Sequence, residues 1–334
     1  MKVAVFGGTG FVGSYLVDAL VAAGHHPVVL VREGSEHRLN QAEHCTLITG
    51  DLDTQAAIEA ALEGADAAIY NIGILREFPR KGITFNALQY QAPVRVIDAA
   101  VAAGVKRFLL MSANGVKEHG TAYQQTKHRT EQHLKETKLD WTIFRPSVIF
   151  GDPRGRMEFA SQLAHDIIDS PLPAPLFFDG LLPTGAGQFK MSPVHVENVA
   201  QAFVNSLDND AAIGKVYRLG GEDSLTWQEI LGRIASAKGK RKLMLPVPAI
   251  GVSAAASLLD RFEAFPVTHD QITMLMEGNT CPADDLVSLG IEPIAFNAET
   301  PVSYTHLRAH ETSLPIAYAV FGWKRGGGGG GGGG

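Results

Sequence analysis

The chain has 334 residues, 45% of them hydrophobic, and a formal net charge of −6 at pH 7. It can therefore bury a large core, and the acidic balance argues against a nucleic-acid-binding surface, which needs clustered basic charge. Cys45 and Cys281 provide neither a disulfide framework nor zinc-ligand spacing, and no apolar run reaches the roughly 18 residues that span a membrane. We expect a cytoplasmic protein with no metal site and no transmembrane segment.

Strand and helix patterns alternate through residues 1–150. Short apolar runs predict buried strands, and apolar residues at helical spacing predict the helices between them. Pro93 predicts a kink in the third of these helices. Because strands separated by helices imply βαβ units, the expected fold class is α/β, a Rossmann doubly wound parallel sheet. We expect strands over 2–6, 27–31, 46–49, 65–71, 107–111 and 141–145, and helices over 11–23, 54–62, 85–103 and 122–137.

Prolines and glycines become frequent after Gly151 and predict loops between residues 171 and 187. Helical patterns follow near 196–206, 226–237 and 248–262. We expect residues 1–150 to form an NAD(P)-binding Rossmann domain to which 190–221 return, and residues 151–301 to form a smaller C-terminal α/β lobe for substrate or partner. The apolar segment 243–262 predicts packing within that lobe; the alternative is a peripheral membrane or quinone-facing surface.

The end of the chain has a different character. Residues 326–334 are consecutive glycines, which bury nothing and lose much backbone entropy on ordering. Residues 302–312, VSYTHLRAHET, resemble one reading frame of a sequencing-library adapter, and 316–325 resemble its continuation into a primer. We interpret 302–334 as a disordered adapter artefact and assign the natural chain only to about Pro301; the alternative is a genuine flexible tail.

A glycine-rich motif, GGTGFVG, stands between the first strand and the first helix. Its glycines permit a tight turn, a close approach of backbone to pyrophosphate, and close packing of helix on strand. The helix N-terminus offers free N–H groups and a positive dipole end to phosphates. The alternative is a tight turn that binds no ligand. The predicted cofactor contacts are Gly7, Thr9, Gly10, Phe11, Val12 and Gly13.

The residue that follows the second strand bears on the choice of cofactor. Arg32 favours NADP(H) over NAD(H), because a guanidinium suits a 2′-phosphate whereas an acid suits the ribose hydroxyl. Glu33 beside it makes the signal less specific, and an ordinary exposed arginine is the alternative. Further cofactor contacts are expected where the third and fourth strands end, from Asp51 (toward the adenine amino group), Leu52, Asn71 and Gly73.

Tyr123 is the only tyrosine with a lysine, Lys127, four residues later. On a helix this spacing places both side chains on one face. A nearby ammonium lowers the pKa of a phenol and makes it a better proton donor and acceptor near neutral pH. Ser112, at the end of the fifth strand, could hold a substrate beside the phenol. The alternative is a surface helix that carries tyrosine and lysine by chance.

The glycine motif, the Tyr-x-x-x-Lys pair and RPSVIFG (Arg145–Gly151) together resemble the short-chain dehydrogenase/reductase superfamily, from Met1 to about Gly221. The resemblance implies that Tyr123 is the general acid/base. It also implies that Lys127 lowers the pKa of Tyr123 and binds the nicotinamide ribose, and that Ser112 orients substrate. The implied nicotinamide contacts are Pro146, Ser147, Val148 and Ile149.

Within that superfamily the chain is similar to atypical members, namely the accessory subunit of respiratory complex I and bacterial relatives of the NAD-dependent epimerase/dehydratase type. RPSVIFGDP, PVHVENVAQAF (Pro193–Phe203) and the late segment 243–262 carry this likeness. It implies tight NADPH binding and association with a quinone-handling complex or with ubiquinone biosynthesis. Asn198 stands where such relatives commonly have aspartate, whereas the complete Tyr123–Lys127 pair exceeds what some non-catalytic relatives retain.

Three functions remain open. The first is an NADP-dependent oxidoreductase or epimerase on a small carbonyl or hydroxyl substrate, with Tyr123 moving the proton. The second is a non-catalytic NADPH-binding accessory or assembly subunit of a respiratory complex, peripheral at the inner face of its membrane. The third is a redox sensor that binds NADPH without chemistry. Substrate specificity depends on the loops of 152–190, whose conformations the sequence does not determine.

Overall fold

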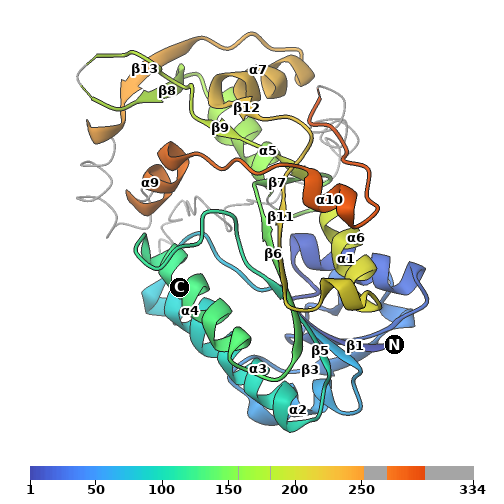
Figure 1. Ribbon diagram of the computed structural model, residues 1–334. Helices are drawn as coiled ribbons and strands as arrows, with labels where there is room; N and C mark the ends of the chain where they lie inside the picture. The colour runs from blue at the N-terminus through green and yellow to red at the C-terminus, as the bar shows by residue number, and fades with distance from the viewer. Residues whose placement is uncertain (157, 181, 252–268, 298–334) are drawn as a thin grey trace, which may run out of the picture.

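The centre of the molecule is a seven-stranded sheet in the order β11-β6-β5-β4-β1-β2-β3, and every neighbouring pair is parallel (Figure 1). The computed structural model describes residues 1–156, 158–180, 182–251 and 269–297. The predicted Rossmann doubly wound fold is confirmed. The strands are β1 (Lys2–Phe6), β2 (His26–Val31), β3 (Thr46–Thr49), β4 (Ala67–Tyr70), β5 (Arg107–Met111), β6 (Asp140–Pro146) and β11 (Lys215–Leu219).

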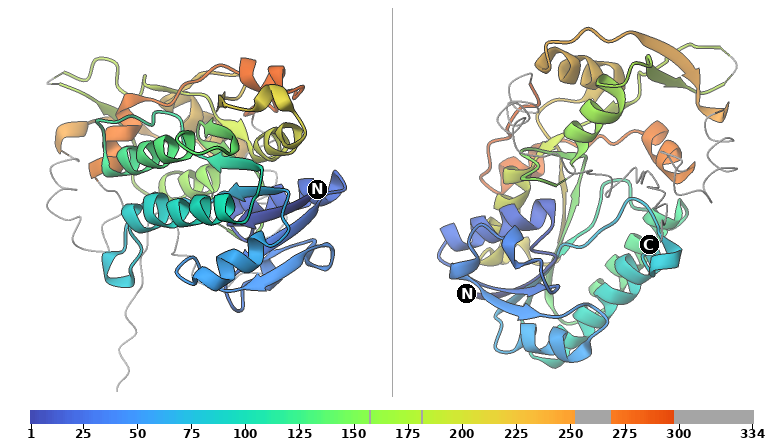
Figure 2. Two further views of the ribbon diagram at one scale, coloured as in Figure 1. Left: turned by 60° about the horizontal axis from the view of Figure 1, so that its bottom comes forward. Right: turned by 180° about the vertical axis from the view of Figure 1, so that it is seen from behind.

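Helices cover both faces of this sheet. On β1, Val3 and Val5 contribute to one core, and Ala4 and Phe6 contribute to the other, as the alternation of strand side chains requires. Burial on both faces explains why the strands are continuous apolar runs. One face is covered by α1 (Phe11–Ala22) and α6 (Val196–Leu207), and the other by α2 (Gln55–Leu62), α3 (Ala92–Ala102) and α4 (Ala122–Lys135), with α3 and α4 side by side (Figure 2).

The predicted interruption at Pro93 is present. A π-helical turn, Ala87–Gln91, precedes α3, and Pro93 lies in the first turn of that helix. Proline has no N–H to donate to the carbonyl four residues earlier, which belongs to Gln89. The Thr130 hydroxyl of α4 donates to that carbonyl oxygen instead, at 2.5 Å. This bond ties α4 to the turn before α3.

A smaller lobe contains its own apolar core. Its main elements are α5 (Phe159–Leu163), α7 (Trp227–Ala237) and α9 (His269–Glu277), together with strands β8 (Ala174–Phe178) and β13 (Met244–Pro248), which pair in parallel. Short strand pairs and one helix join the lobe to the sheet: β7 (Ile149–Phe150) with β10 (Val194–His195), β9 (Lys190–Met191) with β12 (Leu225–Thr226), and α10 (Asp284–Ser288).

One prediction in the lobe was wrong. Residues 171–187 are not loop throughout, because β8 includes Pro175, which a two-stranded ribbon tolerates. The helix expected near 248–262 follows strand β13, Met244–Pro248, and residues 249–251 of it are helical. The remainder of that segment, 252–262, and the tail 302–334 lie outside the described residues.

Within the described parts of the chain, no helix combines the length and the apolar character needed to cross a membrane. The same residues contain no group of three or more His, Cys, Asp or Glu side chains that could hold a metal ion. Cys45 and Cys281 are both free thiols.

Candidate nucleotide and active site

The glycine-rich turn connects β1 to α1, and its glycines are required by packing. Gly7 has φ +98°, and a Cβ there would lie 2.7 Å from Cγ1 of Ile72. A Cβ on Gly13 would lie 2.0 Å from the Gly7 carbonyl oxygen, so only glycine lets α1 start this close to the strand. The first helical bond, from Ser14 N to Gly10 O, leaves the preceding N–H groups of the helix without intrahelical partners. This end of α1 can therefore receive a phosphate.

Arg32 lies at the end of β2 and is exposed, as is Glu33 beside it. The backbone turns there, because Ser35 N donates to the Arg32 carbonyl oxygen. The guanidinium is thus placed on the surface next to the strand end where an adenosine ribose lies in this fold. The location agrees with a contact to the ribose 2′ position, which stays a prediction.

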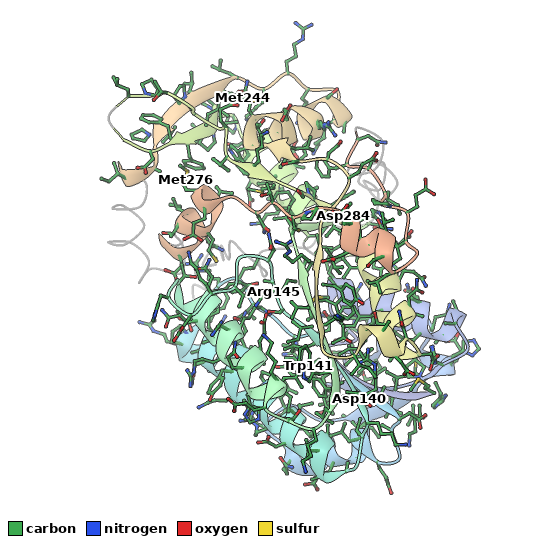
Figure 3. All side chains as sticks on the ribbon, in the orientation of Figure 1. Asp140, Trp141, Arg145, Met244, Met276 and Asp284 are labelled. Atoms are coloured by element: carbon green, nitrogen blue, oxygen red, sulfur yellow. The ribbon has the colours of Figure 1, made fainter. Side chains whose placement is uncertain are left out.

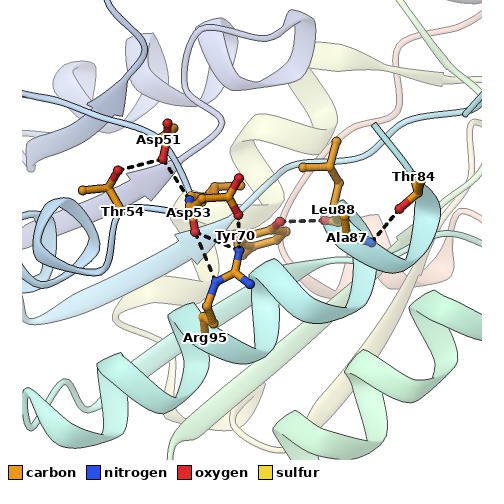
Figure 4. A network of polar contacts seen from close by, with 9 residues as sticks. Asp51, Asp53, Thr54, Tyr70, Thr84, Ala87, Leu88 and Arg95 are labelled. Carbon is orange, nitrogen blue, oxygen red and sulfur yellow. Dashed lines mark hydrogen bonds and ion pairs between the residues drawn. The ribbon is translucent and has the colours of Figure 1, made fainter. Parts of the chain in front are cut away.

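Asp51 and Leu52 follow β3, within a network that organises the start of α2 (Figure 4). The Asp51 carboxylate accepts hydrogen bonds from the Thr54 hydroxyl and the Asp53 N–H, and these bonds lower its pKa. Arg95 donates to the Leu52 carbonyl oxygen and pairs with Asp53 at 2.8 Å. Thr54 donates its hydroxyl to Asp51 and forms no side-chain cap of α2, although it stands at the N-cap position.

Two residues after β4 lie next to other parts of the site. The N–H of Asn71 donates to the Phe6 carbonyl oxygen, and a Cβ on Gly7 would lie 2.9 Å from the Asn71 carbonyl oxygen. A Cβ on Gly73 would lie 3.7 Å from the Lys127 ammonium nitrogen. The structure therefore brings Gly73 to Lys127, and Asn71 to the glycine-rich turn.

Tyr123 and Lys127 lie in the first turns of α4, which begins with a capping box made by Thr121 and Gln124. The Lys127 ammonium lies 5.7 Å from the centroid of the Tyr123 ring and donates to the Met111 carbonyl oxygen at 3.2 Å. The predicted pair is therefore adjacent in space, at the carboxyl end of β5. Phe85 contacts the tyrosine ring edge-to-face, at 5.7 Å between centroids.

The protonation properties of the pair differ from our expectation. Burial raises the pKa of Tyr123, so the predicted lowering by Lys127 is not found in this structure. Burial also lowers the pKa of Lys127 to about 8, and the nearby Glu131 carboxylate opposes that lowering. The physical reason is that removing both groups from water disfavours the charged form of each. The phenol is therefore held protonated, and the ammonium releases its proton more readily than an exposed lysine.

Ser112 directly follows β5, and its hydroxyl is engaged within the chain. Its hydroxyl donates to Glu131 Oε1 at 2.5 Å, and the side chain is buried. It lines a small cavity of about 10 Å³ with Lys127, Gln89 and Tyr70. Because the serine proton is bound to a carboxylate, Ser112 can offer a substrate only a hydrogen-bond acceptor.

Glu131 is a site residue that the sequence analysis missed. It is fully buried and receives a bidentate contact from Arg145, with Nε–Oε1 at 2.8 Å and Nη2–Oε2 at 2.5 Å. Lys135 approaches the same carboxylate at 3.7 Å. Arg145 lies near the middle of the molecule, at the end of β6 (Figure 3). The available signal was spacing, because Tyr123, Lys127 and Glu131 follow one another at intervals of four along one helix face.

Residues 146–149, expected at the nicotinamide, connect the sheet to the lobe. The Ser147 hydroxyl donates to the Asn279 carbonyl oxygen at 2.7 Å. The backbone N–H of Ser147 donates to the Leu219 carbonyl oxygen. The Val148 carbonyl oxygen accepts from Val194, and Pro146 ends β6 beside β11. Ile149 lies in β7 and packs against the core under α1 and α6. The hydroxyl of Ser147 is thus already bonded within the chain.

Arg156 was also missed. It belongs to the loop after β7 and donates from Nε to the Thr9 carbonyl oxygen at 3.0 Å, within the glycine-rich turn. The sequence signal was weak, because GDPRGR looks like an ordinary basic turn and nothing in it indicates a contact with a residue near the N-terminus.

Asn198, which replaces an aspartate expected from the resemblance, has a clear structural role. From α6, its amide nitrogen donates to the Glu292 carbonyl oxygen at 2.9 Å, and its amide oxygen accepts from Ile294 N at 2.8 Å. An amide side chain can make both bonds at once, whereas an ionised aspartate could only accept. The residue fastens the segment after α10 to the Rossmann half.

Comparison with known proteins agrees with this architecture. Residues 7–167 match a protein family described as NAD(P)H-binding. The chain is 28% identical over 268 residues to ceramide reductase of Caulobacter vibrioides, with 80% of each protein covered. It is 29% identical over 301 residues to the mitochondrial NADH dehydrogenase (ubiquinone) 1 alpha subcomplex subunit 9 of Arabidopsis thaliana, covering 85% of this chain and 70% of that protein.

The fold is also that of a solved epimerase. UDP-glucose 4-epimerase of Thermus thermophilus, in complex with NAD, aligns with a TM-score of 0.69 and 20% identity. The alignment covers 92% of this chain and 100% of that one.

Proposed function

Because residues 7–167 match a family described as NAD(P)H-binding, we propose that the chain binds NADP(H) and acts as an oxidoreductase or epimerase on a small carbonyl or hydroxyl substrate. The observation that carries the proposal is the Tyr123–Lys127 pair, which lies at the carboxyl end of β5 next to Gly73. In open α/β sheets, ligands bind outside the carboxyl ends of the strands. The named reductase among the relatives supports the same class of chemistry.

The residues present fit a dinucleotide. The turn at Gly7 and Gly13 has no room for a Cβ, and it brings backbone N–H groups to the start of α1. These groups would hold the pyrophosphate, and Arg32 would face the ribose 2′ position, which favours NADP(H). When bound, the nicotinamide supplies or accepts the hydride.

Tyr123 is suited to donate a proton in the direction of carbonyl reduction. Its half-buried phenol is held protonated, so it can give that proton to a substrate oxygen as the carbonyl carbon is reduced. With a pKa of about 8, Lys127 is mostly cationic at pH 7, so it can stabilise the phenolate that forms. Ser112 would accept a hydrogen bond from a hydroxyl of the substrate.

Replacement of the tyrosine tests the proposal. Tyr123→Phe in the full-length protein should lower NADPH-dependent turnover of an aldehyde and ketone panel by about 10²- to 10⁴-fold, the usual contribution of a general acid. NADPH binding should stay unchanged, because the hydroxyl is all that is removed. The control is Tyr217→Phe, on β11 at the edge of the sheet, which should turn over like the parent. Retained turnover in Tyr123→Phe would exclude the assigned role.

A non-catalytic subunit is the second candidate. Relatives named as complex I subunits in Arabidopsis thaliana and Dictyostelium discoideum favour it, as does the bond that engages the Ser112 proton. In that role the chain would hold NADPH tightly, peripheral at the inner face of a respiratory membrane. Native mass spectrometry of the full-length protein, with and without the candidate substrates, separates the two. A retained NADPH that no substrate oxidises, with co-purified complex subunits, indicates the subunit. The sensor alternative predicts weaker binding and a partner that prefers one redox state of the cofactor.

A further inference from the structure

The loop after β7 reaches back across the molecule to the glycine-rich turn. The Tyr15 hydroxyl of α1 donates to the Asp152 carbonyl oxygen at 3.0 Å. Arg154 pairs with Asp18 of α1 at 2.6 Å, and its guanidinium lies 3.5 Å from the centroid of the Tyr15 ring. The loop is therefore attached to α1 by three contacts, two of which are made by Arg154.

The backbone of this loop adopts an uncommon conformation. Arg154 has φ +48°, the only positive φ at a non-glycine residue among those described. Its N–H donates to the Asp152 carboxylate, which stabilises the turn. Since such a conformation persists only when its surroundings enforce it, the contacts with α1 fix the course of the chain toward Arg156.

Arg156 bridges two segments of the Rossmann half. Its Nε donates to the Thr9 carbonyl oxygen at 3.0 Å, and its Nη2 donates to the Arg38 carbonyl oxygen. A third bond runs to the carbonyl oxygen of Arg154 at 3.1 Å. All three of these acceptors are neutral backbone carbonyl oxygens, and Asp18, the nearby acid, is paired with Arg154. Burial and the charges of Arg38 and Arg154 lower the pKa of Arg156, as is expected where cations gather without enough opposite charge.

The position of this guanidinium identifies the ligand chemistry. Thr9 lies in the turn that faces a dinucleotide, and Arg38 lies in the segment after β2, beside which the adenosine ribose 2′ substituent is bound in this fold. A group bonded to both lies between them. We propose that Arg156 is a ligand of the 2′-phosphate of NADP(H), supplied by the distant loop in addition to Arg32. This inference rests on the proposed binding of NADP(H).

Exchanging the carbonyl acceptors of Arg156 for the oxygens of a 2′-phosphate is energetically favourable for two reasons. A phosphate dianion would replace neutral carbonyl acceptors with charged oxygens, and hydrogen bonds between charged partners are about twice as strong. It would also relieve the repulsion between Arg156 and Arg38. NADH and 5′-AMP lack the 2′-phosphate and gain nothing from either effect.

Paired nucleotides test the assignment directly. The dissociation constants of NADPH, NADH, 2′,5′-ADP and 5′-AMP are measured by calorimetry with the full-length protein, Arg156→Gln and Arg156→Lys. The control is Arg241→Gln, an exposed arginine of the lobe. We expect Arg156→Gln to weaken NADPH and 2′,5′-ADP by about 10- to 100-fold, the range for one hydrogen-bonded charge pair, and to change NADH and 5′-AMP less than about 3-fold. Arg156→Lys should fall between, since it keeps the charge and loses the fork.

Each other outcome is decisive. Equal weakening of NADPH and NADH overturns the inference, because Arg156 would then act on the pyrophosphate or on the turn itself. Unchanged binding of all four nucleotides also overturns it. If Arg156→Gln melts early, Arg156→Lys decides the matter, and a ratio of NADPH to NADH affinity in that variant equal to the ratio in the parent protein counts against the inference. A parent protein that binds no nucleotide removes the proposed function itself, which is distinct from the failure of Arg156 alone.

Discussion

The buried carboxylate of Glu131 supports the candidate site, and Glu131→Gln is the substitution that tests it most sharply. The side chain accepts from Ser112 and Arg145 and lies 3.7 Å from Lys135. The change preserves shape and removes the negative charge. It also turns an acceptor-only group into one whose NH₂ faces existing donors.

The expected cost follows from these contacts. Breaking a buried ion pair by neutralising one partner destabilises by about 3–5 kcal/mol. Arg145 is partly solvent-exposed and can regain water, so we expect the lower end, about 3 kcal/mol. The change also affects Lys127, because Glu131 holds the pKa of that lysine up against burial. Without the carboxylate, the pKa of Lys127 should fall below about 8, and turnover that needs the cation should begin to decline at a lower pH.

Urea unfolding followed by tryptophan fluorescence measures the first effect, and the pH profile of kcat measures the second. Glu136→Gln is the matched control, an exposed glutamate just after α4. The control should unfold like the parent. A loss of under about 1 kcal/mol in Glu131→Gln would refute the stabilising role of the buried pair. A pH profile unchanged at its alkaline limb would refute the coupling of Glu131 to Lys127.

Three further substitutions test other parts of the structure. Burial raises the pKa of Glu158 to about 7, so its folded form resists ionisation, and the stability it confers at low pH is lost as the pH rises from about 4.5 to 7. Glu158→Gln should flatten that decline and be more stable than the parent at pH 8 by up to about 3 kcal/mol, measured by urea unfolding at both pH values. Asn198→Asp removes the donor to the Glu292 carbonyl oxygen and should cost about 1–3 kcal/mol; an unchanged unfolding midpoint would contradict this. Arg32→Asp should weaken NADPH more than NADH in calorimetry, and equal effects would mean that Arg32 does not face the 2′-phosphate.

Most of the Rossmann half could be predicted because its information is local. Apolar runs such as 107–111 are buried on both faces, and glycines such as Gly104 follow the ends of the preceding helices. The spacing of apolar residues and the positions of glycines therefore locate the strands and helices. The elements of the lobe were harder to predict from the sequence. β8 and β13 are strands only because they pair with each other, and the prolines in both obscure that preference in the sequence.

In the candidate site, too, short-range features could be predicted from the sequence and long-range contacts could not. The Tyr123–Lys127 pair is a short-range spacing on one helix, which a sequence reveals. The bond from Arg156 to Thr9 joins residues 147 positions apart, and its existence depends on how the lobe folds back. The pKa of Tyr123 was mispredicted for a related reason, since burial of the ring is a property of the folded whole and outweighs a single neighbouring charge.

The place of β11 in the sheet has a consequence for synthesis on the ribosome. The chain makes the glycine-rich turn and strands β1 to β6 in order, then produces much of the lobe before it reaches β11, which pairs with β6. The nascent sheet therefore carries an open edge at β6 until Leu219 has emerged. Asn279 emerges later still, and both Ser147 and Asn114 bond to it. Because domains fold from the N-terminal side during translation, the glycine-rich turn is formed early and the contacts of Ser147 and Asn114 with Asn279 are made among the last steps.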